Sequence, residues 1–256
     1  MTGLQKVELE KLAVQALENA ESIWNAVGAE MGKIAKSLHN SLSESVKSTI
    51  PGHSLVDFAQ PKVDDFIAIV ADMRNSTEHL REAIGQQPPK PSQLQRVFYE
   101  TAVLLPCLAK TIENEDGRVT EYLGDGVLGL FQLDRNDKST AIYDANRAAR
   151  NCLEMVDVVI NPLLSKRHNL PPLRLGVGMA YSRAVVTVVG LPGFMQPKAF
   201  GECVFYATKF SCGNNEIYVD KNLERIWPTV NSGASIHFAP IKVKDLDAFR
   251  LERKSP

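Results

Sequence analysis

The sequence predicts an α+β domain with a mostly antiparallel sheet, close to a ferredoxin-like core. The first observation is the order of elements: from Val63 onward, short β-rich runs and helical periodicities follow one another as β-α-α-β-β-α-β-β-α-β, a pattern that combines hairpins with crossover helices. The second is the composition, with 44% hydrophobic and 23% charged residues among 256. This is the mix of a globular protein, and the length suits one large domain or two small ones.

The first 50 residues or so are expected to be helical. Apolar residues recur there at the three- and four-residue spacing of one helix face, namely at Val27, Met31, Ile34 and Leu38, continued by Leu42, Val46 and Ile50. Pro51-Gly52 ends the pattern. We therefore divide the chain into an N-terminal helical segment (residues 1–55) and a main domain (residues 56–256). The stripe is too short to establish a coiled coil, so packing on a partner chain and packing on its own domain both stay open.

The elements of the main domain follow from local patterns. An apolar run over residues 66–71 predicts a buried strand, and Asn75, Ser76 or Thr77 then caps a helix. Helices are also expected over residues 92–114, despite Pro106, and over 141–159, and QQPPKPS (86–92) is expected to be a loop. The remaining predicted strands flank Gly124-Asp125-Gly126, lie in LRLGVGMAY and AVVTVVG, and occur near SIHFAP and DAFRLE in the tail.

Charge and apolar runs exclude several classes of function. The 29 Lys and Arg residues balance 30 Asp and Glu residues, for a net charge of −1, which argues against binding nucleic acid or anionic membranes by bulk charge. Apolar runs such as FIAIVA and AVLLPCLA are too short to span a bilayer, and the start lacks the apolar core of a signal peptide. We expect a cytoplasmic protein.

Two carboxylates stand where predicted strands end. Asp72 follows the apolar run of VDDFIAIVADMRNSTEHL, and Asp125 lies at the turn of RVTEYLGDGVLGLF. Taken singly, Asp72 is an ordinary cap or turn residue and Asp-Gly an ordinary hairpin turn. Taken together, they place two acids at adjacent strand ends. Two Mg²⁺ or Mn²⁺ ions that share such carboxylates form the clamp used for in-line phosphoryl transfer.

The order of these motifs resembles that of the class III nucleotidyl cyclases. FIAIVADMRNST is similar to their first metal motif and VTEYLGDGVLGLF to the hairpin with the second metal aspartate. LRLGVGMAYSRAVVTVVG resembles the strand pair that follows, KAFGECVFYATKF the start of the nucleotide-facing helix, and DLDAFRLE the closing strand. The likeness runs from about Val63 to Leu251, and it implies a cyclase domain built on the ferredoxin-like core.

The resemblance assigns metal and phosphate residues. Asp72, Asp125 and the backbone carbonyl of Met73 match the ligands of two Mg²⁺ or Mn²⁺ ions per site. Arg183 matches a phosphate-binding arginine, expected in the turn between two later strands. A C-terminal phosphate-binding lysine corresponds to Lys244 or, as the weaker match, to Lys242. Each of these basic residues taken alone is also compatible with an ordinary surface charge.

The matched base-reading positions depart from the purine cyclases. Glu121 stands where adenylate cyclases carry Lys and guanylate cyclases carry Glu, and Lys198 stands where those families carry Asp or Cys. Phe205 replaces the asparagine that orients the ribose, and Lys209 replaces the transition-state arginine. Lys209 keeps the charge but loses the bidentate fork. We expect Phe205 to close part of the purine pocket and to leave room for a smaller base.

These features most resemble the pyrimidine cyclases of Pycsar antiphage defence, which convert UTP or CTP to the cyclic 3′,5′ monophosphate that activates an effector. Uracil offers an N3–H to Glu121 and carbonyl oxygens to Lys198, which favours UTP. The resemblance also implies a homodimer with composite sites, in which metal ligands come from one chain and base and transition-state residues from the other. The alternatives are a cytidylate cyclase, a guanylate cyclase, a non-catalytic nucleotide sensor and, disfavoured by its missing acidic loop, a dinucleotide cyclase.

Overall fold

The computed structural model describes residues 45–58, 60–79, 93–191, 193–228 and 236–253. The strands are β1 (Ser45–Lys47), β2 (Leu55–Asp57), β3 (Lys62–Met73), β4 (Arg118–Tyr122), β5 (Gly126–Gln132), β6 (Leu175–Leu191), β7 (Phe194–Gly201), β8 (Glu216–Val219), β9 (Ile236–Val243) and β10 (Leu246–Arg253). The helices are α2 (Ser76–His79), α3 (Gln93–Asn114), α4 (Lys138–Met155), the π-helix η1 (Val156–Ile160), α5 (Asn161–His168), α6 (Glu202–Phe210) and α7 (Lys221–Ile226).

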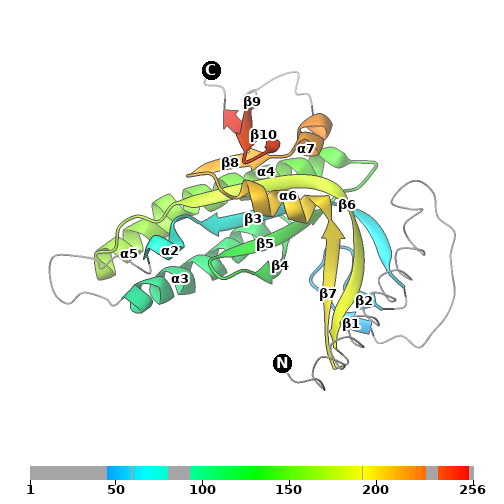
Figure 1. Ribbon diagram of the computed structural model, residues 1–256, viewed down its shortest axis with the longest axis horizontal. Helices are drawn as coiled ribbons and strands as arrows, with labels where there is room; N and C mark the ends of the chain where they lie inside the picture. Colours follow the sequence, from blue (N-terminus) through cyan, green and yellow to red (C-terminus); the bar gives the residue numbers. More distant parts are fainter. Residues whose placement is uncertain (1–44, 59, 80–92, 192, 229–235, 254–256) are drawn as a thin grey trace, which may run out of the picture.

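The predicted α+β class with a ferredoxin-like core is confirmed. The main sheet has the order β4-β5-β3-β6-β8-β10-β9, with β7 paired to β6. Elements β3, α3, β4, β5, α4 and β6 form the βαββαβ unit, in which β3 lies between β5 and β6. Every pairing in the sheet is antiparallel except that of β6 with β8. Figure 1 shows α3, α4 and α5 together beside this sheet.

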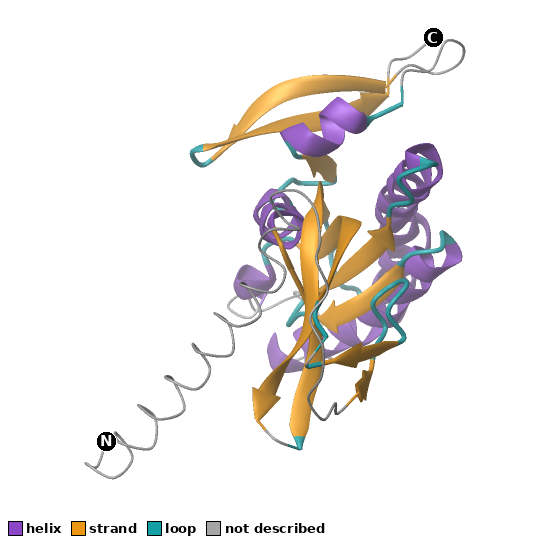
Figure 2. Ribbon diagram, turned by 90° about the vertical axis from the view of Figure 1, so that its right-hand side faces the viewer, coloured by secondary structure: helices purple, strands orange, loops and turns teal. Residues whose placement is uncertain are grey.

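Strand β3 is buried on both of its faces. Its side chains alternate between the faces. Ile67, Ile69 and Met73 join the core under α3 and α4, whereas Phe66 and Val70 join a second core with residues of α6. Helices therefore cover both sides of the sheet (Figure 2). By the same alternation Asp72 lies on the α6 side.

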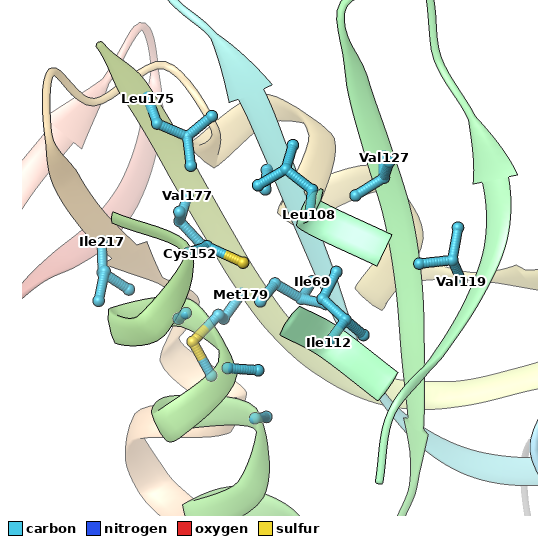
Figure 3. Close-up of a cluster of buried hydrophobic side chains, with 14 of the residues drawn as sticks. Ile69, Leu108, Ile112, Val119, Val127, Cys152, Leu175, Val177, Met179 and Ile217 are labelled. Atoms are coloured by element: carbon cyan, nitrogen blue, oxygen red, sulfur yellow. The ribbon is translucent and has the colours of Figure 1, made fainter. Parts of the chain in front are cut away.

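The larger core fills the space between the sheet and the helical layer. Figure 3 shows Ile69 of β3 and Val127 of β5 beside Leu108 and Ile112 of α3. Helix α3 spans the predicted range and contains Pro106. Helix α4 begins after Asp137, whose carboxylate accepts hydrogen bonds from two backbone N–H groups of the first turn. The predicted helix over residues 141–159 is confirmed, and it continues through η1 into α5.

Helix α6 packs closely on β6 through two glycines. A Cβ on Gly178 would lie 2.0 Å from the carbonyl oxygen of Ala207, and one on Gly176 would lie 2.1 Å from that of Ser211. Only glycine permits this approach of backbone to backbone. The close contact holds the C-terminal end of α6 near Gly176, which is the register partner of Asp72 in β6.

The expectation of two strands in LRLGVGMAY and AVVTVVG was wrong, because both belong to the single strand β6. Ser182-Arg183, expected to form a turn, continues the strand. Buried Asp65 on β3 provides partners for the polar side chains at this point of β6. It accepts a hydrogen bond from the hydroxyl of Tyr181 at 2.8 Å and lies 3.9 Å from Nε of Arg183. The turn comes later, between β6 and β7, and Figure 1 shows β7 beside the curved second half of β6.

The N-terminal helix does not extend to residue 50. Residues 45–47 form β1, in which Val46 pairs with Val56 of β2. Ile50 and Val56 are buried against the sheet, so burial in this hairpin outweighs the helical spacing. Residues 1–44 and the predicted loop 86–92 lie outside the described residues. The division of the chain at residue 55 stays a prediction.

None of the helices in the described ranges has the length and apolar character needed to cross a membrane.

Candidate functional site

Asp72 and Asp125 meet at one edge of the sheet. Asp72 is the penultimate residue of β3 and lies opposite Gly126 of β5. The turn before Gly126 folds back on it, and the N–H of Met73 donates a hydrogen bond to the carbonyl oxygen of Asp125 at 3.1 Å. A Cβ on Gly126 would lie 2.7 Å from Oδ1 of Asp72, so the glycine makes room for the carboxylate. The structure thus brings the two predicted metal ligands together.

The closeness of the two acids perturbs the titration of Asp72. Burial is the largest cause, and together with the charge of Asp125 and a hydrogen bond between the two carboxyls it raises the pKa of Asp72 to about 7. The guanidinium of Arg74, 3.7 Å from Oδ2 of Asp72, acts in the opposite direction. Repulsion between two ionised, half-buried carboxylates is removed either when one of them binds a proton or when a cation binds between them.

The donors at this edge suit a hard divalent cation. Mg²⁺ is bound in proteins by one or two carboxylates, with water and substrate phosphates completing its octahedron. Asp72 and Asp125 supply that number of carboxylates. Among the described residues there is no group of three or more His, Cys, Asp and Glu side chains that could enclose a metal. Two carboxylates are the number of protein ligands that Mg²⁺ takes where phosphate and water complete its coordination. The carbonyl of Met73 as a third contact stays a prediction.

Two arginines that the sequence analysis did not select lie at the same edge. Arg74 contacts Asp72 and also donates from Nη1 to the carbonyl oxygen of Ser211 at 3.3 Å. Its backbone N–H donates to the carbonyl oxygen of Arg174 at 2.8 Å. Arg174 is exposed and immediately precedes β6. The sequence offered only their positions as a signal. Arg74 is two residues after Asp72, and Arg174 directly precedes β6, the strand that pairs with β3.

Arg183 lies far from the two aspartates within one chain. In the register of β3 with β6, Asp72 pairs with Gly176, whereas Arg183 pairs with Asp65. The seven positions between Gly176 and Arg183 correspond to about 23 Å along an extended strand. The expected placement of Arg183 in a turn is therefore corrected, and its role as a phosphate ligand stays a prediction.

Glu121 and Lys198 form an ion pair. Nζ of Lys198 on β7 lies 2.7 Å from Oε2 of Glu121 on β4, and both side chains are about one-third exposed (27% and 32%). The two residues are far apart in the sequence and lie on different strands, β7 and β4. The structure thus joins the two predicted base-reading residues into one donor and acceptor unit.

Phe205 and Lys209 project from the exposed face of α6. They are four residues apart, and Nζ of Lys209 lies 5.5 Å from the centroid of the Phe205 ring. Phe205 is 52% exposed. The buried side of the same helix contains Cys203, Ala207 and Phe210. The two predicted site residues are therefore neighbours, on a surface that no described residue covers.

The predicted C-terminal lysines lie away from these groups. Lys244 is exposed in the turn between β9 and β10, with φ of +54°. Lys242 pairs with Asp247 across that hairpin at 3.1 Å. Strands β6 and β8 separate this hairpin from β3 in the sheet. Within one chain, neither lysine joins the aspartate edge, and their phosphate-binding role stays a prediction.

Comparison with known proteins identifies one curated relative of part of the chain and several solved structures with the same fold. No protein-family model matches the chain. A uridylate cyclase of Gulbenkiania mobilis is 26% identical over 161 residues, which cover 63% of this chain and 60% of that protein. The adenylyl cyclase CyaB of P. aeruginosa is similar in structure with a TM-score of 0.61 and 14% identity, over 77% of this chain and 97% of the other.

Another structure with the same fold is a guanylyl cyclase domain. The dimeric domain of the RhoGC fusion protein of Blastocladiella emersonii has a TM-score of 0.53 and 14% identity, over 77% of this chain and 99% of that one. The solved structures are too distant in sequence to show more than a shared fold. The chain matches less than two-thirds of the length of the curated relative.

The pH dependence of stability tests the carboxylate pair. Between about pH 4 and 7 the Asp72 carboxyl is protonated in the folded protein but ionised in the unfolded chain, because its folded pKa is raised from 3.8 to about 7. Raising the pH through this window therefore favours unfolding. We expect the free energy of unfolding of the metal-free protein, measured in urea, to fall relative to that of Asp72→Asn between pH 5 and 8.

The control for this measurement is Asp157→Asn, which changes an exposed carboxyl of η1. Added Mn²⁺ at pH 8 should restore stability to the wild type and not to Asp72→Asn. If the wild type and Asp72→Asn show parallel profiles from pH 5 to 8, the two carboxyls do not interact as described.

Proposed function

We propose that this chain, whose fold is that of the class III nucleotidyl cyclases, is a pyrimidine nucleotide cyclase that converts UTP to 3′,5′-cyclic UMP and pyrophosphate. The resemblance predicted from the sequence is confirmed by the relatives and the shared fold. The observation that carries the proposal is the meeting of Asp72 and Asp125 at the end of the central strand. The uridylate cyclase of G. mobilis supports the choice of nucleotide.

In this proposal Asp72 and Asp125, with the Met73 carbonyl, hold two Mg²⁺ or Mn²⁺ ions. When bound, the ions would supply acidity at the ribose 3′-hydroxyl and neutralise charge on the phosphates. The reaction forms a bond from the 3′-oxygen to the α-phosphorus and breaks the bond between the α-phosphorus and the oxygen that bridges it to the β-phosphorus. Pyrophosphate leaves, and the 3′-hydroxyl releases one proton. The chain's own contribution is to hold the triphosphate in line and to stabilise its developing charge.

The ion pair of Glu121 with Lys198 supports a pyrimidine base. It presents an acceptor and a donor 2.7 Å apart. Uracil offers the complementary N3–H donor beside a carbonyl acceptor, and cytosine offers its amino group beside N3. A carboxylate that accepts an imide N–H favours UTP, with CTP as the second candidate. Glu121 alone also suits guanine, but Lys198 and the bulk of Phe205 oppose a guanylate cyclase.

The charges near Asp72 support a triphosphate site. We assign Arg174 and Arg74 to the phosphates, because both lie at the aspartate edge. Lys209 meets charge on the α-phosphate. Arg183 and Lys244, or Lys242, stay as further phosphate ligands only if another chain brings them to the site.

The placement of these groups supports a homodimer with two composite sites. Phe205 and Lys209 are uncovered on α6, and Val189, Leu191 and Phe194 are exposed at the end of the β6–β7 ribbon, with Phe194 81% exposed. A second copy that covers these surfaces would bring Lys209 of one chain to Asp72 of the other. We further propose that the protein acts in the cytoplasm and that its product activates a partner effector in antiphage defence.

The central experiment is an assay with each of the four NTPs and Mn²⁺, with products identified by mass. We expect cyclic UMP as the main product, and cyclic CMP in smaller yield. Asp72→Ala and Asp125→Ala should each reduce turnover at least about 100-fold, because even outer-shell partners of metals contribute 10–100-fold. Asp157→Ala is the matched control. Cyclic GMP alone would exclude the pyrimidine assignment, and no cyclic product from any NTP would favour a nucleotide sensor.

Composite sites predict complementation between inactive chains. Mixing an Asp72→Ala chain with a Lys209→Ala chain should restore activity, because half of the sites in each mixed dimer then have both groups intact. The measurement is turnover of UTP as a function of mixing ratio. Absence of any recovery, with both variants folded and dimeric by light scattering, contradicts shared sites.

The arginine assignment predicts a difference between Arg174 and Arg183. Arg174→Ala should raise the KM for UTP about 10-fold or more, since hydrogen bonds to charged groups contribute about 1.5–3 kcal/mol. Arg183→Ala should change KM less and should lower the midpoint of thermal unfolding, because its partner Asp65 is buried. The reverse pattern would assign the phosphates to Arg183.

A further inference from the structure

The side chains of Phe205 and Lys209 form one unit on α6. Residues four apart lie on the same face of a helix, and Nζ of Lys209 is 5.5 Å from the ring centroid of Phe205, within the range of a cation–π interaction. Lys209 makes no ion pair with any residue that the structure describes. Within one chain, the Lys209 ammonium therefore lies against the ring of Phe205.

The ring of Phe205 is itself anchored to the core through aromatic contacts. It meets Tyr206 edge-on, with centroids 5.5 Å apart and planes at 72°. Tyr206 in turn stacks on Phe210, with centroids 5.7 Å apart and planes at 16°. Phe210 is completely buried. A row of aromatic contacts therefore leads from the exposed Phe205 to the interior.

The lysine requires such an anchor more than an arginine would. Its ammonium lies at the end of a four-carbon stem with large rotamer freedom, and it lacks the planar fork that fixes an arginine on a phosphate. Immobilising this stem costs conformational entropy. A ring face that holds the ammonium before substrate binds reduces that cost, as preorganisation does in other charge-stabilising sites.

We propose that Phe205 is a positioning residue, which holds the Lys209 ammonium where charge develops on the α-phosphate. The inference rests on the proposed cyclase function. In this proposal Phe205 and Lys209 act together, rather than as two independent replacements of the asparagine and the arginine found in the purine cyclases. It also differs from a role of Phe205 in filling the base pocket, because a positioning role affects turnover of every nucleotide that the enzyme accepts.

The test compares substitutions that separate the ring face from apolar bulk. Phe205→Leu keeps the bulk and removes the aromatic face, and Phe205→Tyr keeps the face. We expect Phe205→Leu to lower kcat on UTP and on CTP about two- to five-fold, the effect of one exposed cation–π contact. KM should stay unchanged, and Phe205→Tyr should retain wild-type kcat. The matched control is Phe98→Leu, an exposed phenylalanine of α3.

A double-mutant cycle shows whether Phe205 acts through Lys209. In a Lys209→Met background, Phe205→Leu should have no further effect on kcat. An equal loss in both backgrounds would overturn the proposal. A change in the ratio of UTP to GTP turnover, with kcat on UTP intact, would also overturn it and assign Phe205 to the base pocket.

A measurement independent of activity separates this inference from the proposed function. In protein labelled with ¹³C at the lysine ε-carbon, the ring of Phe205 should shift the ε-methylene protons of Lys209 upfield. Phe205→Leu should abolish this shift and Phe98→Leu should leave it. Cyclic product without the shift overturns this inference alone. The shift without any cyclic product overturns the proposed function and, with it, the role of the contact in catalysis.

Discussion

The burial of β3 between β5 and β6 is the constraint on which the rest of the structure depends. Residues Phe66–Ala71 are 0–1% exposed, because one face of the strand packs under α3 and α4 and the other under α6. The hydrogen-bond ladders on both sides fix its register. Asp72 must therefore emerge at one defined place, beside the turn that bears Asp125.

The fold enforces unfavourable electrostatics at the aspartate edge. Burial and the neighbouring carboxyl both destabilise ionised Asp72, and the hydrogen bond from Met73 N–H to the Asp125 carbonyl ties the two segments together. Arg74, 3.7 Å from Asp72, provides compensating positive charge. Near-neutral overall charge is compatible with this arrangement, because only a few charged side chains lie at the aspartate edge.

Local sequence patterns were sufficient to predict many of the secondary-structure elements and the positions of the two acids. The apolar run before Asp72, the Gly-Asp-Gly hairpin and the periodicity of α3 were predicted correctly, since each depends on neighbours within about a dozen residues. Non-local contacts explain the errors. Asp65 allows β6 to continue through Arg183, and burial of Ile50 and Val56 converts the expected helix end into a hairpin. Arg174 was not selected because its closeness to Arg74 depends on the pairing of β6 with β3.

The sequence by itself determined the order of the elements, the two acids at strand ends and the residue types of the candidate site. Only the tertiary structure decided which of these residues meet. It joined Glu121 to Lys198 and Phe205 to Lys209, and it separated Arg183 from the aspartates within one chain. The physical reason is that strand register and sheet curvature arise from contacts between distant segments, whereas the patterns of strands and helices depend on residues close together in the sequence.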